Sequence, residues 1–228
     1  APWILYKKDF QAIGGHDPLF APFPYEDSDI FQRWILAGYD LVQSRDSFVY
    51  HLTCRGHRWN EQIGKDDEYF KQASKRAGRN YLRKWGSWIK NDDFQCPIIT
   101  PKYNIAFVVK SCNYSLLEAL EPWCDRIYIE DDMQVLTDSY IQNEQADTTY
   151  DLSKRVLCIN HNDPEGENDI VVKFDAPKLT NENFHLLQQL PAVIQDSGDV
   201  GEFELDIFTV TISHLQEYQN DLIVCSTI

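Results

Sequence analysis

Residues 104–129 read NIAFVVKSCNYSLLEALEPWCDRIYI and contain the pattern that decides the fold class. The apolar run at 104–109 is typical of a buried strand, residues 114–120 favour a helix, and residues 126–129 again favour a strand. Strand, helix and strand in this order indicate a βαβ unit. We therefore expect an α/β fold, of the mixed α+β kind, with a mixed sheet.

Further segments extend this pattern towards the C-terminus. Residues 169–174 favour another strand, and Thr180 is a natural N-cap for a helix over residues 181–195. Residues 203–212 and 221–225 have strand character. The C-terminal part is therefore predicted to be a small α/β domain.

Charge divides the chain near residue 96. The 228 residues carry a net charge of −15, with 14 basic and 13 acidic residues up to Cys96 and 7 basic and 23 acidic residues after it. Prolines at Pro97 and Pro101 are typical of a boundary. We expect two domains, residues 1–96 and 97–228. The acidic second domain should repel nucleic acid, and no apolar run approaches the ~18 residues that span a bilayer.

The chain begins at Ala1 and its single methionine is Met133, so we expect a fragment or a processed product, without a visible signal peptide. Its six cysteines form no C-x-x-C pair, which argues against a zinc ribbon and indicates no disulfide framework. These features favour a reduced, cytoplasmic chain.

An acidic pair precedes a predicted helix in the first domain. Glu26 and Asp27 come just before apolar residues that recur at helical spacing up to Gly38, so we expect a helix over residues 27–37. Carboxylates in a first helical turn face the positive end of the helix and stay ionised at neutral pH. An ionised carboxylate can act as a general base, although capping alone is the simpler interpretation.

Five short motifs follow one another through the first domain. They are Gly14-Gly15-His16-Asp17, Tyr25-Glu26-Asp27-Ser28-Asp29, Arg33-Trp34, Gly38-Tyr39 and Ser47-Phe48-Val49-Tyr50-His51. Their order and spacing resemble the closing, acceptor-side half of family 2 glycosyltransferases, which have a GT-A fold. The resemblance covers residues 1–95 and implies a partial GT-A C-terminal subdomain, followed by the small α/β domain.

The resemblance implies roles for individual residues. Asp27 matches the catalytic base of the family, and Glu26 lies beside it to contact or orient the acceptor. Substrate-binding positions are implied at Gly14, Gly15, Asp17, Arg33 and Trp34. An aromatic residue at the helical spacing of Trp34 is more often part of a core, so Arg33 is the stronger polar contact.

The same resemblance implies a divalent metal, Mn²⁺ or Mg²⁺, which would neutralise the departing nucleoside diphosphate in an inverting transfer. His51 matches the position that completes the metal site, with His57 as a second candidate, whereas a hydrogen-bonded structural histidine is the alternative. The nucleotide-binding half of the family, with its D-x-D motif, would precede Ala1, so this chain alone is expected to be inactive.

The predicted function is therefore transfer of a sugar from a nucleotide-sugar donor to the hydroxyl of a carbohydrate or other acceptor. The alternative is a non-catalytic carbohydrate-binding or acceptor-binding module, or an oligomerisation unit. Self-association as a homo-oligomer is expected if apolar surface is left uncovered.

Three other charged segments have simpler interpretations. A predicted helix over residues 66–89 has a basic face that suits an anionic ligand but is more often solvated. Residues 130–132 at a strand end resemble an acidic motif of nucleotide-sugar domains, but an acidic loop is the preferred interpretation. Residues 163–169 lack the alternation of an EF-hand, so a solvated loop is expected there.

Overall fold

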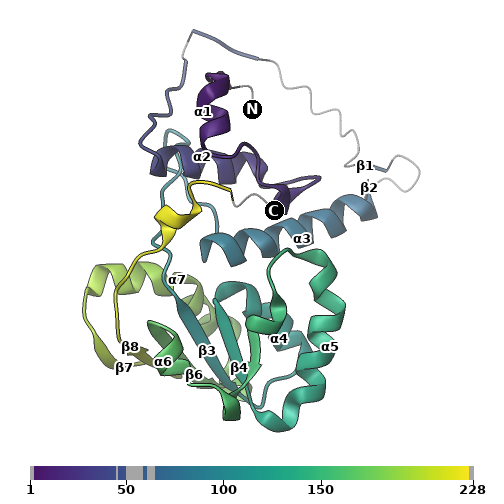
Figure 1. The fold of residues 1–228 in the computed structure, drawn as a ribbon, viewed down its shortest axis with the longest axis vertical. Coiled ribbons are helices and arrows are strands. Elements are labelled where there is room, and N and C mark those ends of the chain that lie inside the picture. The colour runs from purple at the N-terminus through teal and green to yellow at the C-terminus, as the bar shows by residue number, and fades with distance from the viewer. Residues whose placement is uncertain (1–2, 45, 50–58, 61–64, 226–228) are drawn as a thin grey trace. The chain divides into compact units, whose positions relative to one another are not determined.

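The computed structural model describes residues 3–44, 46–49, 59–60 and 65–225 (Figure 1). The chain forms two compact units. Unit 1 takes in the described residues of 1–79, 89–99 and 220–228, and unit 2 comprises residues 80–88 and 100–219. Each unit combines segments from either side of residue 96, whereas the sequence pattern placed a single boundary there.

Unit 1 is built mainly from helical segments. They are α1 (Lys7–Ala12), η1 (Pro18–Phe20), α2 (Glu26–Leu36) and the first part of α3 (Glu68–Trp85). A two-residue antiparallel pair, β1 (Trp59–Asn60) with β2 (Lys65–Asp66), precedes α3, and the short helix η9 (Gln219–Leu222) lies near the C-terminus.

The apolar stripe of α2 forms the core of unit 1. Ile30 and Trp34, one helical turn apart, are buried together with Ile13, and Trp3 and Phe31 pack against them. The ring of Trp34 meets that of Trp3 edge-on, with centroids 5.2 Å apart. The helix expected over residues 27–37 is confirmed, because burial follows the helical spacing that predicted it.

Unit 2 is built on a six-stranded mixed sheet. Its strands are β3 (Ile105–Lys110), β4 (Arg126–Ile129), β5 (Val156–Cys158), β6 (Ile170–Asp175), β7 (Gly201–Leu205) and β8 (Phe208–Ile212), in the spatial order β5-β4-β3-β6-β8-β7. Strands β3 to β6 run parallel, and β8 runs antiparallel to both of its neighbours. The expected α/β fold with a mixed sheet is confirmed at this level.

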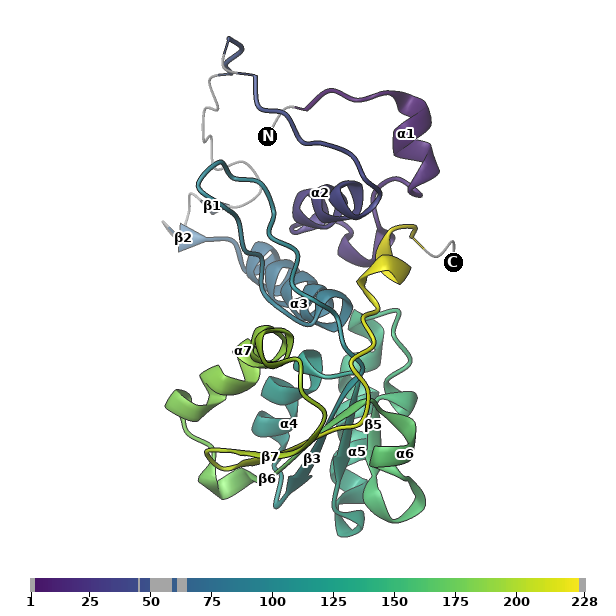
Figure 2. The same cartoon turned by 90° about the vertical axis from the view of Figure 1, so that its left-hand side faces the viewer.

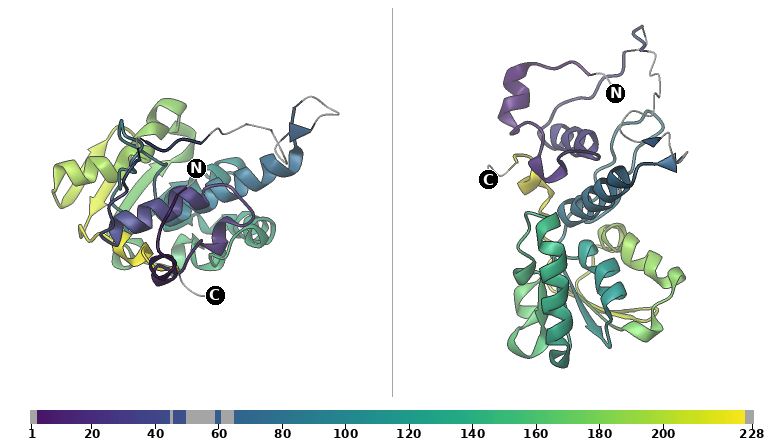
Figure 3. Two further views of the ribbon diagram at one scale, coloured as in Figure 1. Left: turned by 90° about the horizontal axis from the view of Figure 1, so that it is seen from above. Right: turned by 90° about the vertical axis from the view of Figure 1, so that its right-hand side faces the viewer.

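Helices join and cover the strands of unit 2. The α-helices are α4 (Tyr114–Leu120), α5 (Gln134–Glu144), α6 (Pro164–Glu167) and α7 (Asn181–Ser197). Short 3₁₀ turns between them are η3 (Glu121–Trp123), η4 (Asp131–Met133), η5 (Gln145–Asp147), η6 (Leu152–Lys154), η7 (Ile159–His161) and η8 (Ala176–Lys178). Figure 3 shows α4 and α5 side by side.

The two faces of the sheet are covered differently. On one face, Phe107 and Val109 of β3 are buried in a large core with Leu117 of α4 and Leu190 of α7, and Figure 2 shows these two helices together on that side. On the other face, the smaller cluster of Ala106, Val108, Tyr128 and Val171 is covered by residues 157–168, which include α6. The second face is therefore thinly covered, by one short segment in place of the longer helices α4 and α7.

Local chemistry explains the elements that were predicted correctly. The helix expected after Thr180 is α7, and Thr180 and Asn183 form a reciprocal capping box at its first turn. The strands expected at 104–109, 126–129 and 169–174 are β3, β4 and β6, whose side chains are buried as continuous apolar runs predict for parallel strands.

Several predicted elements differ in the structure. Residues 203–212 are not one strand, because Asp206 adopts a left-handed conformation at φ 55° and turns the chain between β7 and β8. Residues 221–225 contain the end of η9 instead of a strand. The acidic segment 163–169, where a solvated loop was expected, contains α6, which begins at a proline.

Candidate functional site

The first turn of α2 carries the predicted acidic pair. Tyr25 precedes the helix in a left-handed conformation at φ 82° and gives it no side-chain cap. Glu26 and Asp27 follow, and both are half-buried. The Glu26 Oε2 atom is buried and has no hydrogen-bond partner among the described residues. A buried carboxylate oxygen without a donor is costly, so this atom is suited to accept a hydrogen bond from a ligand hydroxyl or from water.

The Gly14–Gly15 turn is bound to α2 by Arg33. This side chain is fully buried, and its Nη1 donates to the carbonyl of Ile13 at 2.7 Å while its Nη2 donates to the carbonyl of Gly15. Its Nε donates to Asp29 Oδ2 at 2.8 Å. Gly14 and Gly15 both have left-handed backbone conformations, at φ 82° and 70°, which glycine adopts without strain. The Gly14-Gly15 and Arg33-Trp34 motifs are separate in the sequence, but Arg33 joins them in the structure.

Arg33 and Trp34 contact protein groups in this structure. All three hydrogen bonds of Arg33 described above remain inside unit 1, and Trp34 is 5% exposed in its aromatic core. Asp17 caps η1, because its Oδ1 accepts from the Leu19 amide at 2.9 Å. The roles of these three residues in substrate binding stay predictions, and their observed contacts are structural.

The predicted metal ligand His51 and the second candidate His57 lie outside the described residues. Within the described part of the chain, one group of side chains has metal-ligand spacing: atoms of Asp17, Asp29 and Cys225 lie within 4.8 Å of one another. This donor set does not fit Mn²⁺ or Mg²⁺, because hard cations prefer oxygen ligands and Asp29 is already paired with Arg33. The group is not evidence of a metal.

An open pocket of about 500 Å³ lies in unit 2 at the ends of its two central strands. Lys110 is the last residue of β3 and Asp175 the last of β6, and the two are register partners. The strand order reverses here, since β4 and β5 lie on one side of β3 and β6 on the other. In open α/β sheets, ligands bind outside the carboxyl ends of the strands at this position.

The pocket combines apolar walls with balanced charges. Its lining comprises the apolar residues Val108, Ile159, Pro164, Phe174 and Ile207, the polar Thr209, the lysines Lys110, Lys173 and Lys178, and the acids Asp163, Glu165 and Asp175. Lys178 hydrogen-bonds to Asp175 at 2.8 Å, and that bond, together with the positive charges of Lys178 and Lys110, lowers the pKa of Asp175 below its ordinary value. The lysines can therefore bind negatively charged groups of a ligand, and the acidic residues can bind positively charged groups.

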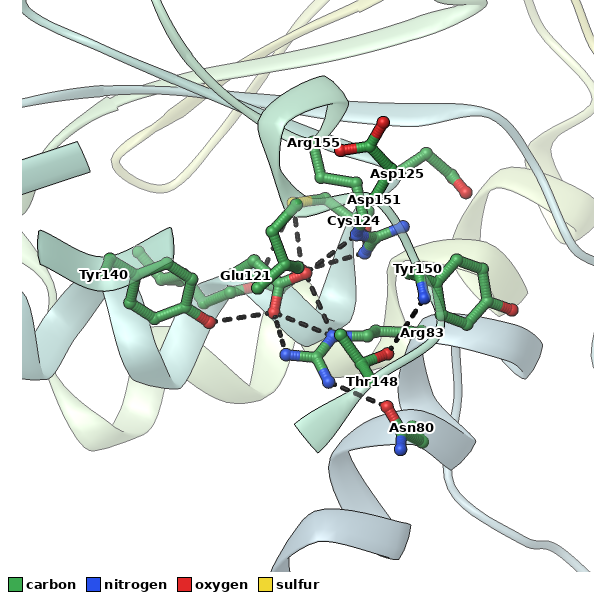
Figure 4. Close-up of polar contacts among 12 residues, drawn as sticks. Asn80, Arg83, Glu121, Cys124, Asp125, Tyr140, Thr148, Tyr150, Asp151 and Arg155 are labelled. Carbon is green, nitrogen blue, oxygen red and sulfur yellow. Dashed lines mark hydrogen bonds and ion pairs between the residues drawn. The ribbon is translucent and has the colours of Figure 1, made fainter. Parts of the chain in front are cut away.

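A buried ionic network lies elsewhere in unit 2 (Figure 4). The carboxylate of Glu121 in η3 accepts from Arg83 of α3, from Arg155 and from Tyr140 of α5. Arg83 also donates to Asn80 at 2.8 Å. Burial alone would raise the pKa of Glu121, but the charges and hydrogen bonds of Arg155 and Arg83 lower it to about 2. Glu121, Arg83 and Tyr140 are nearly inaccessible, so the network has a structural role.

The sequence patterns did not identify the pocket or the ionic network. A signal for the pocket was present, because charged residues follow the predicted strands 104–109 and 169–174 directly, at Lys110 and Asp175. The network offered no signal, since Glu121 is paired with residues 38 and 34 positions away.

No family model, no curated protein and no solved structure matches this chain. Among the described residues, no helix is both long and apolar enough to cross a membrane.

Proposed function

We propose that this chain belongs to an enzyme that transfers a sugar from a nucleotide-sugar donor to an acceptor hydroxyl with inversion, and that unit 1 supplies the acceptor side. The observation that carries the proposal is the link between the Gly14–Gly15 turn and α2 through Arg33. This link places the glycine motif and the Glu26–Asp27 pair on one buried scaffold in unit 1. The relationship of unit 1 to the GT-A fold is likewise a part of what we propose.

In the proposed reaction, Asp27 accepts the proton of the acceptor hydroxyl as its oxygen attacks the anomeric carbon of the donor. The bond from that carbon to the nucleoside diphosphate breaks as the new glycosidic bond forms. Glu26 orients the acceptor through its buried Oε2 atom, which has no described partner in the structure. A divalent metal, when bound, would supply charge neutralisation to the leaving diphosphate.

The test is turnover of a nucleotide-sugar panel by the full-length protein with manganese, comparing the native chain with Asp27→Asn. Removing a general base lowers the rate by about 10²–10⁴-fold, so Asp27→Asn should lose nearly all transfer. Asp40→Asn, at an exposed aspartate of unit 1, is the matched control and should retain full activity. Turnover unchanged in Asp27→Asn would contradict the proposed base.

A non-catalytic carbohydrate-binding or acceptor-binding module is the second candidate. The buried Glu26 Oε2 atom, which has no described partner, supports it, because an acceptor hydroxyl can donate to this atom without being transferred. This alternative predicts sugar binding that is independent of manganese and unaffected by Asp27→Asn. An oligomerisation unit would bind no sugar and would instead show concentration-dependent mass in sedimentation experiments.

A further inference from the structure

The pocket of unit 2 has the size and position of a small-molecule site. Its volume of about 500 Å³ falls in the range of ~300–1,000 Å³ that is typical of ligand pockets. It opens on the thinly covered face of the sheet, where Val108 of β3, Lys173 of β6 and Thr209 of β8 lie in one row across three strands. Three hydrogen-bonded strands of the sheet therefore form the floor of the pocket.

The lysines of the pocket are available to an anion. Lys110 is exposed and forms no ion pair with any described carboxylate. Lys173 is paired with Glu165 and Lys178 with Asp175, but all four side chains are at least 40% exposed. Exposed ion pairs contribute little to stability, so both lysines can exchange these partners for a phosphate at little cost.

The remaining lining residues fit an organic group bearing hydroxyls. Ile159 and Ile207, both partly exposed, offer apolar surface to a planar ring. Asp163 and Glu165 supply carboxylate oxygens that accept hydrogen bonds from sugar hydroxyls, and acidic residues have this role in nucleotide-binding α/β sheets. A ring, hydroxyls and adjacent phosphates together are the features of a nucleotide.

We propose that this pocket binds a nucleoside diphosphate, with its phosphates at Lys110, Lys173 and Lys178 and its nucleoside against the apolar walls. The site lies entirely within unit 2 and does not depend on the sugar-transfer proposal, whose residues Glu26 and Asp27 lie in unit 1. A nucleotide site here would give unit 2 a ligand at a pocket that the sequence patterns did not identify.

The test is calorimetric titration of the full chain with ADP, GDP, UDP and CDP, and in parallel with inorganic pyrophosphate and the four nucleosides. We expect at least one nucleoside diphosphate to saturate a single site. It should bind at least about tenfold more tightly than either pyrophosphate or its own nucleoside, because each half lacks the contacts of the other.

Charge-removing variants connect this binding to the pocket. Lys110→Gln and Lys173→Gln should each weaken it by about tenfold, the effect of losing one hydrogen bond to a charged group. Lys154→Gln, at a lysine of unit 2 that is 81% exposed and outside the pocket, is the matched control and should bind as the native chain does.

Three results would overturn the inference: no nucleoside diphosphate binding at millimolar concentration, affinity unchanged in Lys110→Gln, or pyrophosphate binding as tightly as the best nucleoside diphosphate. Asp27→Asn should bind the nucleoside diphosphate normally. If the chain binds the nucleoside diphosphate but the full-length protein transfers no sugar in the manganese assay, the result supports this site and contradicts only the sugar-transfer proposal.

Discussion

Arg83 and Glu121 form a two-pronged ion pair in the interior of unit 2, although 38 positions separate them in the sequence. Arg83 Nε donates to Glu121 Oε1 at 3.1 Å, and Nη2 donates to Oε2 at 2.7 Å. Arg155 Nε donates to Oε1 at 2.8 Å and Tyr140 donates to Oε2 at 3.0 Å. One carboxylate thus contacts two buried guanidinium groups and joins α3, η3 and α5 to Arg155, the residue before β5.

Glu121→Gln should destabilise the chain strongly. The substitution preserves the shape of the side chain but removes the negative charge that both buried arginines, Arg83 and Arg155, contact directly. Breaking a buried ion pair in this way typically costs about 3–5 kcal/mol. Urea unfolding followed by circular dichroism measures the loss. Glu202→Gln, at an exposed position of β7, is the control and should change stability by less than about 0.5 kcal/mol. Equal stability of the two variants would show that the network contributes little.

The same network predicts an acid-sensitive stability. The folded pKa of Glu121 is about 2 against an ordinary 4.5, so its contribution is fully present above pH 4.5 and is lost as pH falls from there through 2. The difference corresponds to roughly 3 kcal/mol. The gap in unfolding free energy between the native chain and Glu121→Gln should therefore narrow progressively below pH 4.5. A gap that stays constant down to pH 3 would contradict this assignment.

The elements predicted correctly are those whose signal is local. A continuous apolar run identifies β3 and β6, and Thr180 as an N-cap identifies the start of α7. The helix α5 was missed because Gln134–Glu144 mixes polar and apolar residues and has few of the latter on one face. β5 was missed because three residues are too short for a periodic pattern.

Among the candidate site residues, too, positions with a local sequence signal were predicted correctly, and contacts between distant residues were not. Glu26 and Asp27 were placed correctly in the first turn of a helix, because an acidic pair before an apolar repeat is a local signal. The burial of Arg33 was not predicted, since it depends on carbonyls of Ile13 and Gly15 that lie 20 and 18 positions away. Position in the chain identified the motif, but only the fold shows what its arginine contacts.

Arg33→Lys should loosen unit 1 despite keeping the charge. Lysine lacks the planar fork of donors, so it cannot serve Asp29 and the carbonyls of Ile13 and Gly15 together. We expect faster hydrogen exchange in peptides covering residues 10–36, by about tenfold or more, because unsatisfied buried carbonyls favour local opening. Arg76→Lys, at a half-buried arginine whose Nη2 donates to the Ala21 carbonyl, is the matched control. Unchanged exchange in Arg33→Lys would mean that the turn is held by other contacts.

Thr180→Ala tests the start of α7. The Thr180 Oγ1 atom accepts from the Asn183 amide at 3.3 Å, and the Asn183 side chain accepts from the Thr180 amide at 2.7 Å. Losing an N-cap costs about 1 kcal/mol, which urea unfolding resolves. Thr180→Ser keeps the hydroxyl and should recover most of that loss. If serine is as destabilising as alanine, the methyl group of Thr180 matters more than its cap.

Thiol labelling gives an independent check on which parts of unit 2 are buried. Burial raises the pKa of the Cys112 thiol to about 11 and also raises that of Cys124, which is 1% exposed, whereas Cys158 is partly accessible. Because the thiolate is the reactive form, a disulfide reagent at pH 8 should label Cys158 first and Cys112 and Cys124 only after unfolding. Peptide mass mapping of a time course in native buffer and in urea assigns each site. Rapid native labelling of Cys124 would mean that the segment around η3 opens readily, and the ionic network of Glu121 would then be less stable than its geometry indicates.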